Sequence, residues 1–143
     1  MTNALTVRGV HHIGILVRDS QATAASFAAL GLEVRSWEDY GPGLLRIGFI
    51  PLGDTLLELI EPLTAEGFNA DWLRDRGEGV QHIALHVDDI GGAMRVLAAR
   101  GVPVRDTTPR PGAAQTLIAF LAPQATGGYL IELTQPVTEA RQR

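Results

Sequence analysis

The sequence contains no cysteine among its 143 residues. Disulfide bonds, thiolate metal ligands and a cysteine nucleophile are therefore excluded. Runs of basic residues are also missing, and the formal net charge is -4 with a pI near 5.5. Nucleic acids and anionic membranes bind clustered basic faces. We therefore expect a small-molecule partner, and neither a nucleic acid nor a membrane.

Long apolar segments are absent as well. No stretch approaches the roughly 18 residues that a membrane helix needs. The N-terminal segment MTNALTVRGV lacks the apolar core and the small-residue cleavage site of a signal peptide. We therefore expect a cytoplasmic protein. With 45% hydrophobic residues, a chain of this length is expected to fold as one domain, residues 1–143.

The most informative feature that is present is an internal repeat. GVHHIGILVRD, from Gly9 to Asp19, aligns with GVQHIALHVDD, from Gly79 to Asp89. GLEVRS matches GVPVRD at the same offset, and LLELIEP reappears as LIELTQP near the end of the second copy. The chain therefore consists of two modules, at about 8–62 and 79–136.

Each module is predicted to have the order β-α-β-β-β. Short segments rich in β-branched residues indicate strands. Asp19 or Ser20 can cap the first helix, and Gly31 and Gly101 end the helices of the two copies. A short helix at 69–76 joins the modules. The predicted strands are 12–17, 33–37, 45–52 and 55–61, then 82–87, 104–107, 116–122 and 128–133.

This pattern predicts an α+β fold in which the two βαβββ modules are related by a pseudo-twofold axis. Neither module can bury both faces of its sheet alone. We therefore expect the strands to form a curved sheet around a shared cleft, and a cleft is the usual place for a ligand site.

Four residues with metal-binding side chains recur at equivalent places of the repeat. His12 corresponds to His82, and Glu58 corresponds to Glu132. Each glutamate stands between apolar neighbours in its strand, where a buried carboxylate is costly unless something positive compensates it. Side chains alternate along a strand, so leucines beneath the helices would leave Glu58 and Glu132 pointing into the cleft.

Two imidazoles and two carboxylates form a nitrogen and oxygen ligand set that suits Mn, Co, Ni, Fe or Zn. The sequence therefore predicts a divalent metal held by His12, Glu58, His82 and Glu132. His11 is expected on the opposite face with a structural role. His86 lies on the same face as His82, so we expect it to line a substrate pocket or to be an ordinary surface residue.

At these motifs the sequence resembles the vicinal oxygen chelate superfamily, and within it the methylmalonyl-CoA epimerases. The resemblance covers about Val10 to Pro136. It implies that His12, His82 and Glu132 bind the metal and that Glu58 fills a fourth ligand position. The motifs that carry it are HHIGILVRD, FIPLGDTLLELIEPL, WLRDRGEGVQHIALHVDDI and ATGGYLIEL.

Two positions depart from the epimerase pattern. Arg46 stands where some epimerases have a glutamate that is proposed as a base. The segment that usually reads His-Pro-Lys is Ala122-Pro123-Gln124 here. The first departure speaks against a proton transfer that uses residue 46. The second leaves another thioester or another acid open as the substrate.

The resemblance implies epimerisation of a 2-carboxyacyl-CoA thioester through a metal-stabilised enolate. Glu58 and Glu132 are the expected catalytic carboxylates on the two sides of the site. Arg46 and Arg110 are expected to flank the cleft and to attract the anionic acyl thioester. We also expect a homodimer, with the alanine-rich helix at 21–30 as a candidate contact.

Other activities of the superfamily remain open on the sequence alone. A glyoxalase I-type lactoylglutathione lyase uses the same ligand types and the same enediolate chemistry. An extradiol dioxygenase is disfavoured, because a fourth protein ligand would crowd oxygen and the catechol at the metal. A non-catalytic protein that binds an antibiotic or another small molecule is disfavoured because such relatives usually replace the metal ligands with apolar residues.

Overall fold

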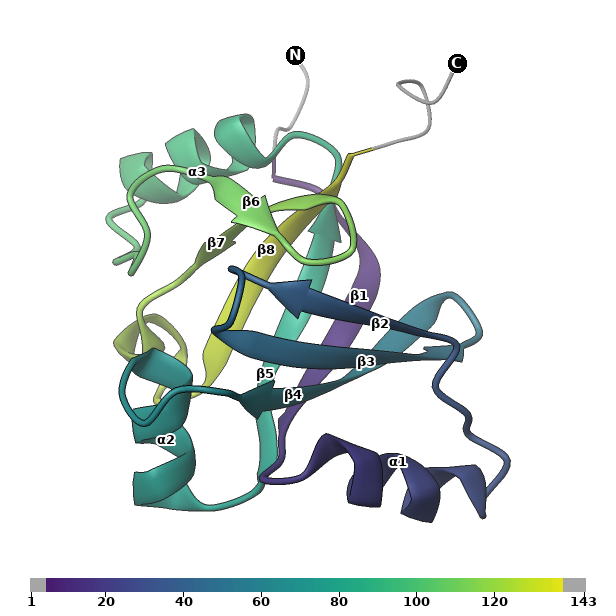
Figure 1. Ribbon diagram of the computed structural model, residues 1–143. Helices are drawn as coiled ribbons and strands as arrows, with labels where there is room; N and C mark the ends of the chain where they lie inside the picture. The colour runs from purple at the N-terminus through teal and green to yellow at the C-terminus, as the bar shows by residue number, and fades with distance from the viewer. Residues whose placement is uncertain (1–4, 138–143) are drawn as a thin grey trace. The chain divides into compact units, whose positions relative to one another are not determined.

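The computed structural model describes residues 5–137. Strands and helices follow one another in the predicted order, and a short 3-10 helix stands before the last strand. The elements are β1 (Val7–Leu16), α1 (Ser20–Ala28), β2 (Ser36–Tyr40), β3 (Leu45–Leu52), β4 (Thr55–Pro62), α2 (Phe68–Arg76), β5 (Gly79–Val87), α3 (Ile90–Ala99), β6 (Arg110–Gly112), β7 (Thr116–Phe120), η1 (Pro123–Thr126) and β8 (Leu130–Pro136) (Figure 1).

The described chain divides into two compact units. One contains residues 12–81, and the other contains residues 5–11 and 82–137. The strand order is β2-β3-β4-β1 in the first unit and β5-β8-β7-β6 in the second. In both units the first and last strands of the module run parallel, and the hairpin strands run antiparallel. The predicted α+β class and the two βαβββ modules are confirmed.

In the first unit, helix α1 packs on β3 and β4 (Figure 1). Fully buried Leu59 and Ile50 form the centre of this contact, and Phe27 of α1 packs against them. Leu57 and Leu59 therefore lie on the face of β4 that α1 covers. Because side chains alternate along a strand, Glu58 lies on the opposite face of β4.

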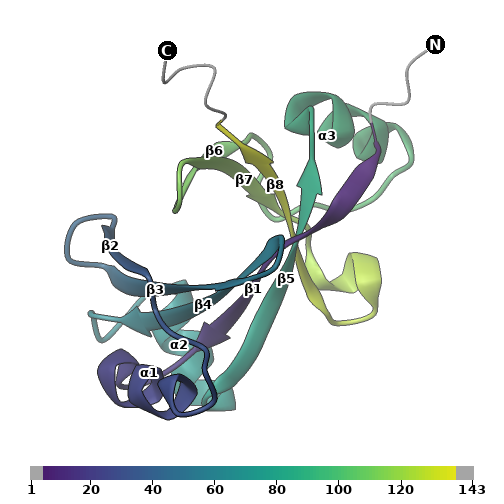
Figure 2. The same ribbon diagram turned by 90° about the vertical axis from the view of Figure 1, so that its right-hand side faces the viewer.

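The second unit repeats this arrangement with α3 packed on β7 and β8. Leu133 and Ala119 lie against Met94 and Leu97 of α3 in one buried cluster. Figure 2 shows β8, β7 and β6 side by side in this unit, in the order given by the strand pairing. Glu132, between Ile131 and Leu133, therefore lies on the face of β8 that α3 does not cover.

Neighbouring residues explain where α1 and α3 begin and end. Asp19 accepts a hydrogen bond from the N–H of Ala22, and Asp89 accepts one from Gly92, so both helices have an aspartate N-cap. Gly31 and Gly101, just past the helix ends, have φ of 83° and 73°. A left-handed residue after a helix favours glycine, and the predicted helix ends are confirmed.

The predicted strand at 104–107 is wrong. Only an isolated bridge joins Val104 to Leu121 there, and the edge strand β6 lies further on, at Arg110–Gly112. The reason is the side chain of Asp106, which accepts the backbone N–H of Phe120 at 2.9 Å. A carboxylate thus takes the place of the backbone carbonyl that would continue the ladder.

The connecting helix is present as α2 and begins one residue earlier than predicted, at Phe68. The ring of Phe68 packs against the ring of Trp72. The guanidinium of Arg76 lies over the Trp72 ring, 3.8 Å from its centroid. None of the helices within residues 5–137 is long and apolar enough to span a membrane.

Candidate metal and active site

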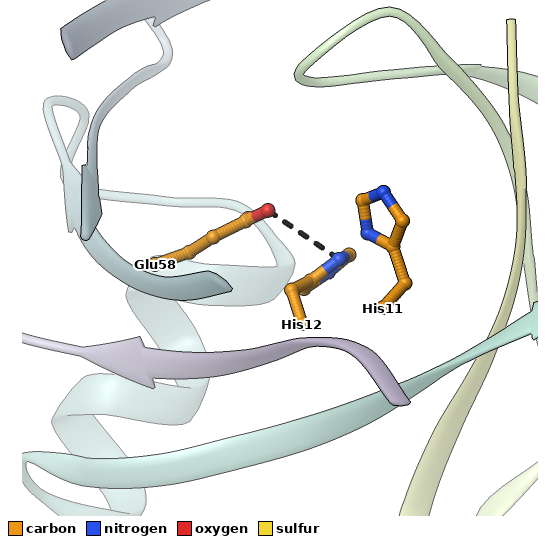
Figure 3. A group of neighbouring side chains, drawn as sticks. All are labelled: His11, His12 and Glu58. Atoms are coloured by element: carbon orange, nitrogen blue, oxygen red, sulfur yellow. Dashed lines mark ion pairs between the residues drawn. The ribbon is translucent and has the colours of Figure 1, made fainter. Parts of the chain in front are cut away.

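The first unit brings His12 and Glu58 together. His12 stands on β1 and Glu58 on the neighbouring strand β4, and 3.4 Å separate His12 Nδ1 from Glu58 Oε2. Figure 3 shows the carboxylate of Glu58 directed at the His12 ring, with the His11 ring nearby. One ligand atom from each of His11, His12 and Glu58 lies within 4.8 Å of the other two, so the predicted place of His11 on the opposite face is wrong. Both paired residues are almost fully buried, with 5% and 3% of their surface exposed.

The second unit contains the equivalent pair, His82 on β5 and Glu132 on β8. Here 3.1 Å separate His82 Nε2 from Glu132 Oε1. These residues are as deeply buried as the first pair, with 5% and 2% exposed. The second oxygen of Glu132, Oε2, accepts a hydrogen bond of 2.8 Å from the hydroxyl of Thr134.

Each pair forms for the same local reason. The residue opposite Glu58 on β1 is Gly14, and the residue opposite Glu132 on β5 is Ala84. These small residues stand two positions after the histidines, so they lie on the same face. A glycine or alanine there leaves room for the glutamate side chain to reach back along the neighbouring strand to the histidine.

The surroundings of His82 include an aromatic ring and a cation. Phe120 of β7 lies opposite Glu132 and meets the His82 ring edge-on, with 5.2 Å between ring centroids. The guanidinium of Arg110 lies 5.9 Å from the Phe120 ring centroid. Asp106 holds Arg110 in place, with 3.5 Å from Arg110 Nε to Asp106 Oδ1. These contacts place Arg110 beside the second pair.

Strand register places Arg110 and His86 on one face. Arg110 lies opposite Ile118, Ile118 opposite Thr134, and Thr134 opposite His86. These four residues form a cross-strand row. The neighbouring row on the same face of the second unit contains Glu132, two residues before Thr134 on β8. His86 Nε2 is 3.7 Å from Asp88 Oδ1, so this side chain is directed partly at an exposed carboxylate.

Asp88 is also bound by Arg8. Arg8 Nε donates a hydrogen bond of 2.7 Å to Asp88 Oδ2. This hydrogen bond, followed by the charges of Arg8 and His86, lowers the pKa of Asp88 despite some loss of hydration that acts in the opposite direction. Asp88 therefore stays ionised to lower pH than an isolated aspartate.

Arg46 does not join the face that carries Glu58. It lies opposite Glu61 on β4 and next to Ile47, while Glu58 lies opposite Phe49. Counting along β3, Arg46 and Phe49 are on opposite faces. Its Nη1 is 3.9 Å from Glu61 Oε1. The predicted substrate contact of Arg46 stays a prediction, and the structure gives this residue a partner on the helix-covered face.

The chemistry of the two pairs fits a metal ion. Histidine nitrogen and glutamate oxygen are common metal ligands, and two imidazoles with two carboxylates suit borderline divalent ions. Two ligand atoms at about 2.1 Å from one ion, at tetrahedral or right angles, lie about 3 Å apart. The nitrogen-to-oxygen distances of 3.4 and 3.1 Å within the pairs have this size.

Sequence reasoning missed three contributors to these surroundings. They are Thr134, which donates to Glu132, and Phe120 with Asp106, which position Arg110. Thr134 carried a signal, since it is a polar residue two positions after Glu132 and therefore on the same face of the strand. The contacts of Phe120 and Asp106 depend on strand register and left no local signal.

The chain is similar to known proteins over most of its length. A sequence profile of the Glyoxalase/Bleomycin resistance protein/Dioxygenase superfamily matches residues 11–120. The chain is 34% identical over 126 residues to the "Uncharacterized protein YqjC" of Bacillus subtilis (strain 168), a match that covers 87% of this chain and 90% of that protein. It is 33% identical over 129 residues to the ethylmalonyl-CoA/methylmalonyl-CoA epimerase of Cereibacter sphaeroides, covering 88% of this chain and 96% of the relative.

Among solved structures, the crystal structure of methylmalonyl-CoA epimerase from Mycobacterium tuberculosis matches with a TM-score of 0.90 at 29% identity. The match covers 100% of this chain and 97% of that chain. The fold is therefore shared along the length of both proteins, and the resemblance inferred from the sequence motifs is confirmed. The chain belongs to the Glyoxalase/Bleomycin resistance protein/Dioxygenase superfamily.

Proposed function

We propose that this protein is a metal-dependent epimerase of a 2-carboxyacyl-CoA thioester of the methylmalonyl-CoA type. The observation that carries the proposal is the buried His–Glu pair that each of the two units contains at the same position of the repeat. The similarity to epimerases of such thioesters over most of the chain supports the choice of substrate class.

The proposed ligands of the metal are His12, Glu58, His82 and Glu132. When bound, a divalent ion supplies a Lewis acid that stabilises negative charge on the substrate carbonyl oxygens. The donor set is compatible with Co, Mn, Ni, Zn or Fe. Without a counter-charge the two buried carboxylates would be costly, so the pairs are better suited to holding a cation than to packing alone.

Epimerisation breaks the C–H bond of the carbon between two carbonyl groups and forms it again on the other face. The electron pair of that bond is delocalised over the carbonyl groups in the intervening enolate. The chain must therefore provide a proton acceptor and a proton donor. Glu58 and Glu132 are the proposed groups, because each carboxylate is buried, directed at a histidine and supplied by a different copy of the repeat.

Recognition of the substrate carboxylate is proposed for Arg110. Its guanidinium is held by Asp106 beside Phe120 and lies on the same face as Glu132. An arginine can bind a carboxylate through two parallel hydrogen bonds. His86, in the same row as Arg110, is proposed to line the same part of the site.

The decisive experiment combines metal analysis with deuterium exchange. The purified chain should contain one divalent ion, and in heavy water it should exchange the α-proton of methylmalonyl-CoA or ethylmalonyl-CoA. His12→Ala and His82→Ala should each remove the ion and the exchange, as expected if both pairs serve one ion. Exchange that persists in metal-free protein, or activity only on the glutathione hemithioacetal of methylglyoxal, would overturn the proposal in favour of another reaction.

Assembly and location are part of the same proposal. The homodimer and the cytoplasmic location expected from the sequence stay predictions. Size-exclusion chromatography with light scattering measures the first, and fractionation of the source cells measures the second. Neither result changes the chemistry proposed for the His–Glu pairs.

A further inference from the structure

Thr134 distinguishes the two glutamates. Thr134 is completely buried. It stands two residues after Glu132 on β8, so both side chains lie on the same face of the strand. The Thr134 hydroxyl donates a hydrogen bond of 2.8 Å to Oε2 of Glu132, while Oε1 of Glu132 lies 3.1 Å from His82. The two oxygens of one carboxylate are thus directed at two different side chains.

The counterpart of Thr134 in the first unit is Ile60. It stands two residues after Glu58 on β4, is also buried, and has no polar atom in its side chain. The surrounding rows match, since Thr134 lies opposite Ile118 and Ile60 lies opposite Ile47. The repeat therefore offers an internal comparison of one glutamate with a hydroxyl at this position and one without it.

A buried hydroxyl is costly where an aliphatic side chain of the same volume would fit, unless it forms a hydrogen bond. Valine would fill the space of Thr134 without any such cost. The hydroxyl of Thr134 donates its hydrogen bond to a proposed metal ligand. Residues that hydrogen-bond a metal ligand typically fix the orientation of that ligand. The same bond restrains rotation of the Glu132 carboxylate.

We infer that Thr134 is a positioning residue that anchors Glu132 in the metal site, so that, of the two proposed proton-transfer carboxylates, only Glu58 leaves the metal during turnover. The part of the inference that concerns Glu58 rests on the proposed function. The anchoring of Glu132 by Thr134 does not depend on it. A carboxylate that leaves the metal to accept a proton must rotate. The hydroxyl of Thr134 opposes that rotation in Glu132, and residue 60 cannot do the same for Glu58.

The anchoring is tested by metal affinity, which requires no turnover. Thr134→Val removes the hydroxyl at almost constant volume, and Thr134→Ser keeps it. In the full-length chain, titrated with Mn²⁺ or Zn²⁺ against a chelator, Thr134→Val should bind about 10- to 100-fold more weakly. Thr134→Ser should recover most of the affinity, and Ile60→Val is the matched packing control that should leave it unchanged. Wild-type affinity in Thr134→Val would overturn the inference.

The division of roles is tested by exchange of the substrate α-proton in heavy water with saturating metal. Glu58→Gln should abolish exchange yet bind metal within a few-fold of wild type, whereas Glu132→Gln should lose metal affinity as its main effect. Ile60→Thr, which places a hydroxyl behind Glu58, should slow exchange several-fold without weakening metal binding. If Thr134→Val does not fold, wild-type exchange in Ile60→Thr overturns the inference by itself.

The two proposals fail in different ways. If the wild-type chain binds metal but exchanges no malonyl-type thioester, the proposed function fails, while the comparison of Thr134→Val with Thr134→Ser still decides the anchoring. If exchange is normal and Glu132→Gln is the variant that keeps metal and loses exchange, the proposed function stands and the division of roles is reversed and therefore wrong.

Discussion

Arg46 on β3 lies directly across from Glu61 on β4, with 3.9 Å between Arg46 Nη1 and Glu61 Oε1. Ser20, at the start of α1, donates two hydrogen bonds to Oε1 of Glu61. One comes from the backbone nitrogen of Ser20 at 2.9 Å, and the other comes from the Ser20 hydroxyl at 2.6 Å. These contacts connect β3, β4 and α1 on the helix-covered face of the first unit. Arg46 is therefore part of the support for α1.

We predict that Arg46→Glu acts on stability. The change replaces an attractive, partly exposed pair by two carboxylates on neighbouring strands, which costs about 1 kcal/mol. The melting temperature should fall by about 3 °C, and Arg46→Gln should show roughly half of this effect. Calorimetry and steady-state kinetics check the prediction together. A strong rise in KM at an unchanged melting temperature would instead show that Arg46 contacts the substrate, as the sequence alone suggested.

Gly112 is predicted to tolerate no side chain. A Cβ at this position would lie 2.5 Å from Ile118 Cγ2 and 2.7 Å from Thr116 Oγ1, and both neighbours are buried. Gly112→Ala should therefore lower the free energy of unfolding by about 1–3 kcal/mol, as overpacked sites do. Urea unfolding with an unchanged m-value measures this loss.

Gly48→Ala is the matched control for this prediction. The new Cβ would lie 2.8 Å from Trp37 Cζ3, but Trp37 is 41% exposed, so its ring can swing into solvent. The stability loss should be smaller than for Gly112→Ala, and the fluorescence of Trp37 should shift to the red. Equal losses at both positions would show that the neighbours of Gly112 can also move aside.

The sequence predicted those features of the fold that depend on neighbouring residues. Asp19 caps α1 and Gly31 ends it because capping and left-handed conformations depend on a few adjacent residues. Alternation along β4 placed Leu57 and Leu59 beneath α1, which left Glu58 on the other face. The repeat then extended the same argument to Glu132.

The features that could not be predicted depend on strand register. The spacing of Arg46 from Phe49 fixes its face only once Phe49 is known to lie opposite Glu58. Likewise, a carboxylate from Asp106 replaces backbone pairing beside β7, and no propensity of residues 104–107 reveals it. Strand register decided the first case, and a long-range hydrogen bond of one side chain decided the second.

A pH-dependent prediction follows from Arg8 and Asp88. A carboxyl group whose pKa is lowered in the folded state stabilises the fold above its unfolded-state pKa, and this contribution is lost as the pH falls through the folded-state pKa. Because the Arg8 hydrogen bond is the main cause of the lowered pKa of Asp88, Arg8→Gln should raise that pKa toward 3.8, the ordinary value.

The measurement is a carbon NMR titration of the Asp88 carboxyl in both proteins. The melting temperature of Arg8→Gln should be slightly lower near neutral pH, and the difference should vanish below the folded-state pKa of Asp88. Since both side chains are more than half exposed, added salt should reduce the difference. A difference that is constant with pH would mean that Arg8 acts through packing.

The role of Arg110 can be separated from general electrostatics. Its guanidinium is bound by Asp106 and lies near Phe120, whose ring contacts His82. If Arg110 binds the substrate carboxylate, Arg110→Ala removes a charge-assisted hydrogen bond. Such a bond contributes about 1.5–3 kcal/mol, so KM for a carboxylated acyl thioester should rise by about ten-fold or more. Arg95→Ala, at an exposed position of α3, is the matched control for the loss of one positive charge.

The comparison of two ligands then identifies which anion Arg110 binds. Inhibition by an acyl thioester whose acyl group is uncharged, such as propionyl-CoA, should be almost the same in wild type and Arg110→Ala, because this inhibitor lacks the acyl carboxylate. The wild-type KM for the carboxylated substrate should also rise with ionic strength, and this dependence should be weaker in the variant. Equal loss of affinity for both ligands would assign Arg110 to the CoA portion, since only that portion is common to them. A variant with wild-type KM and an unchanged melting temperature would remove Arg110 from the substrate site, although it shares a sheet face with Glu132.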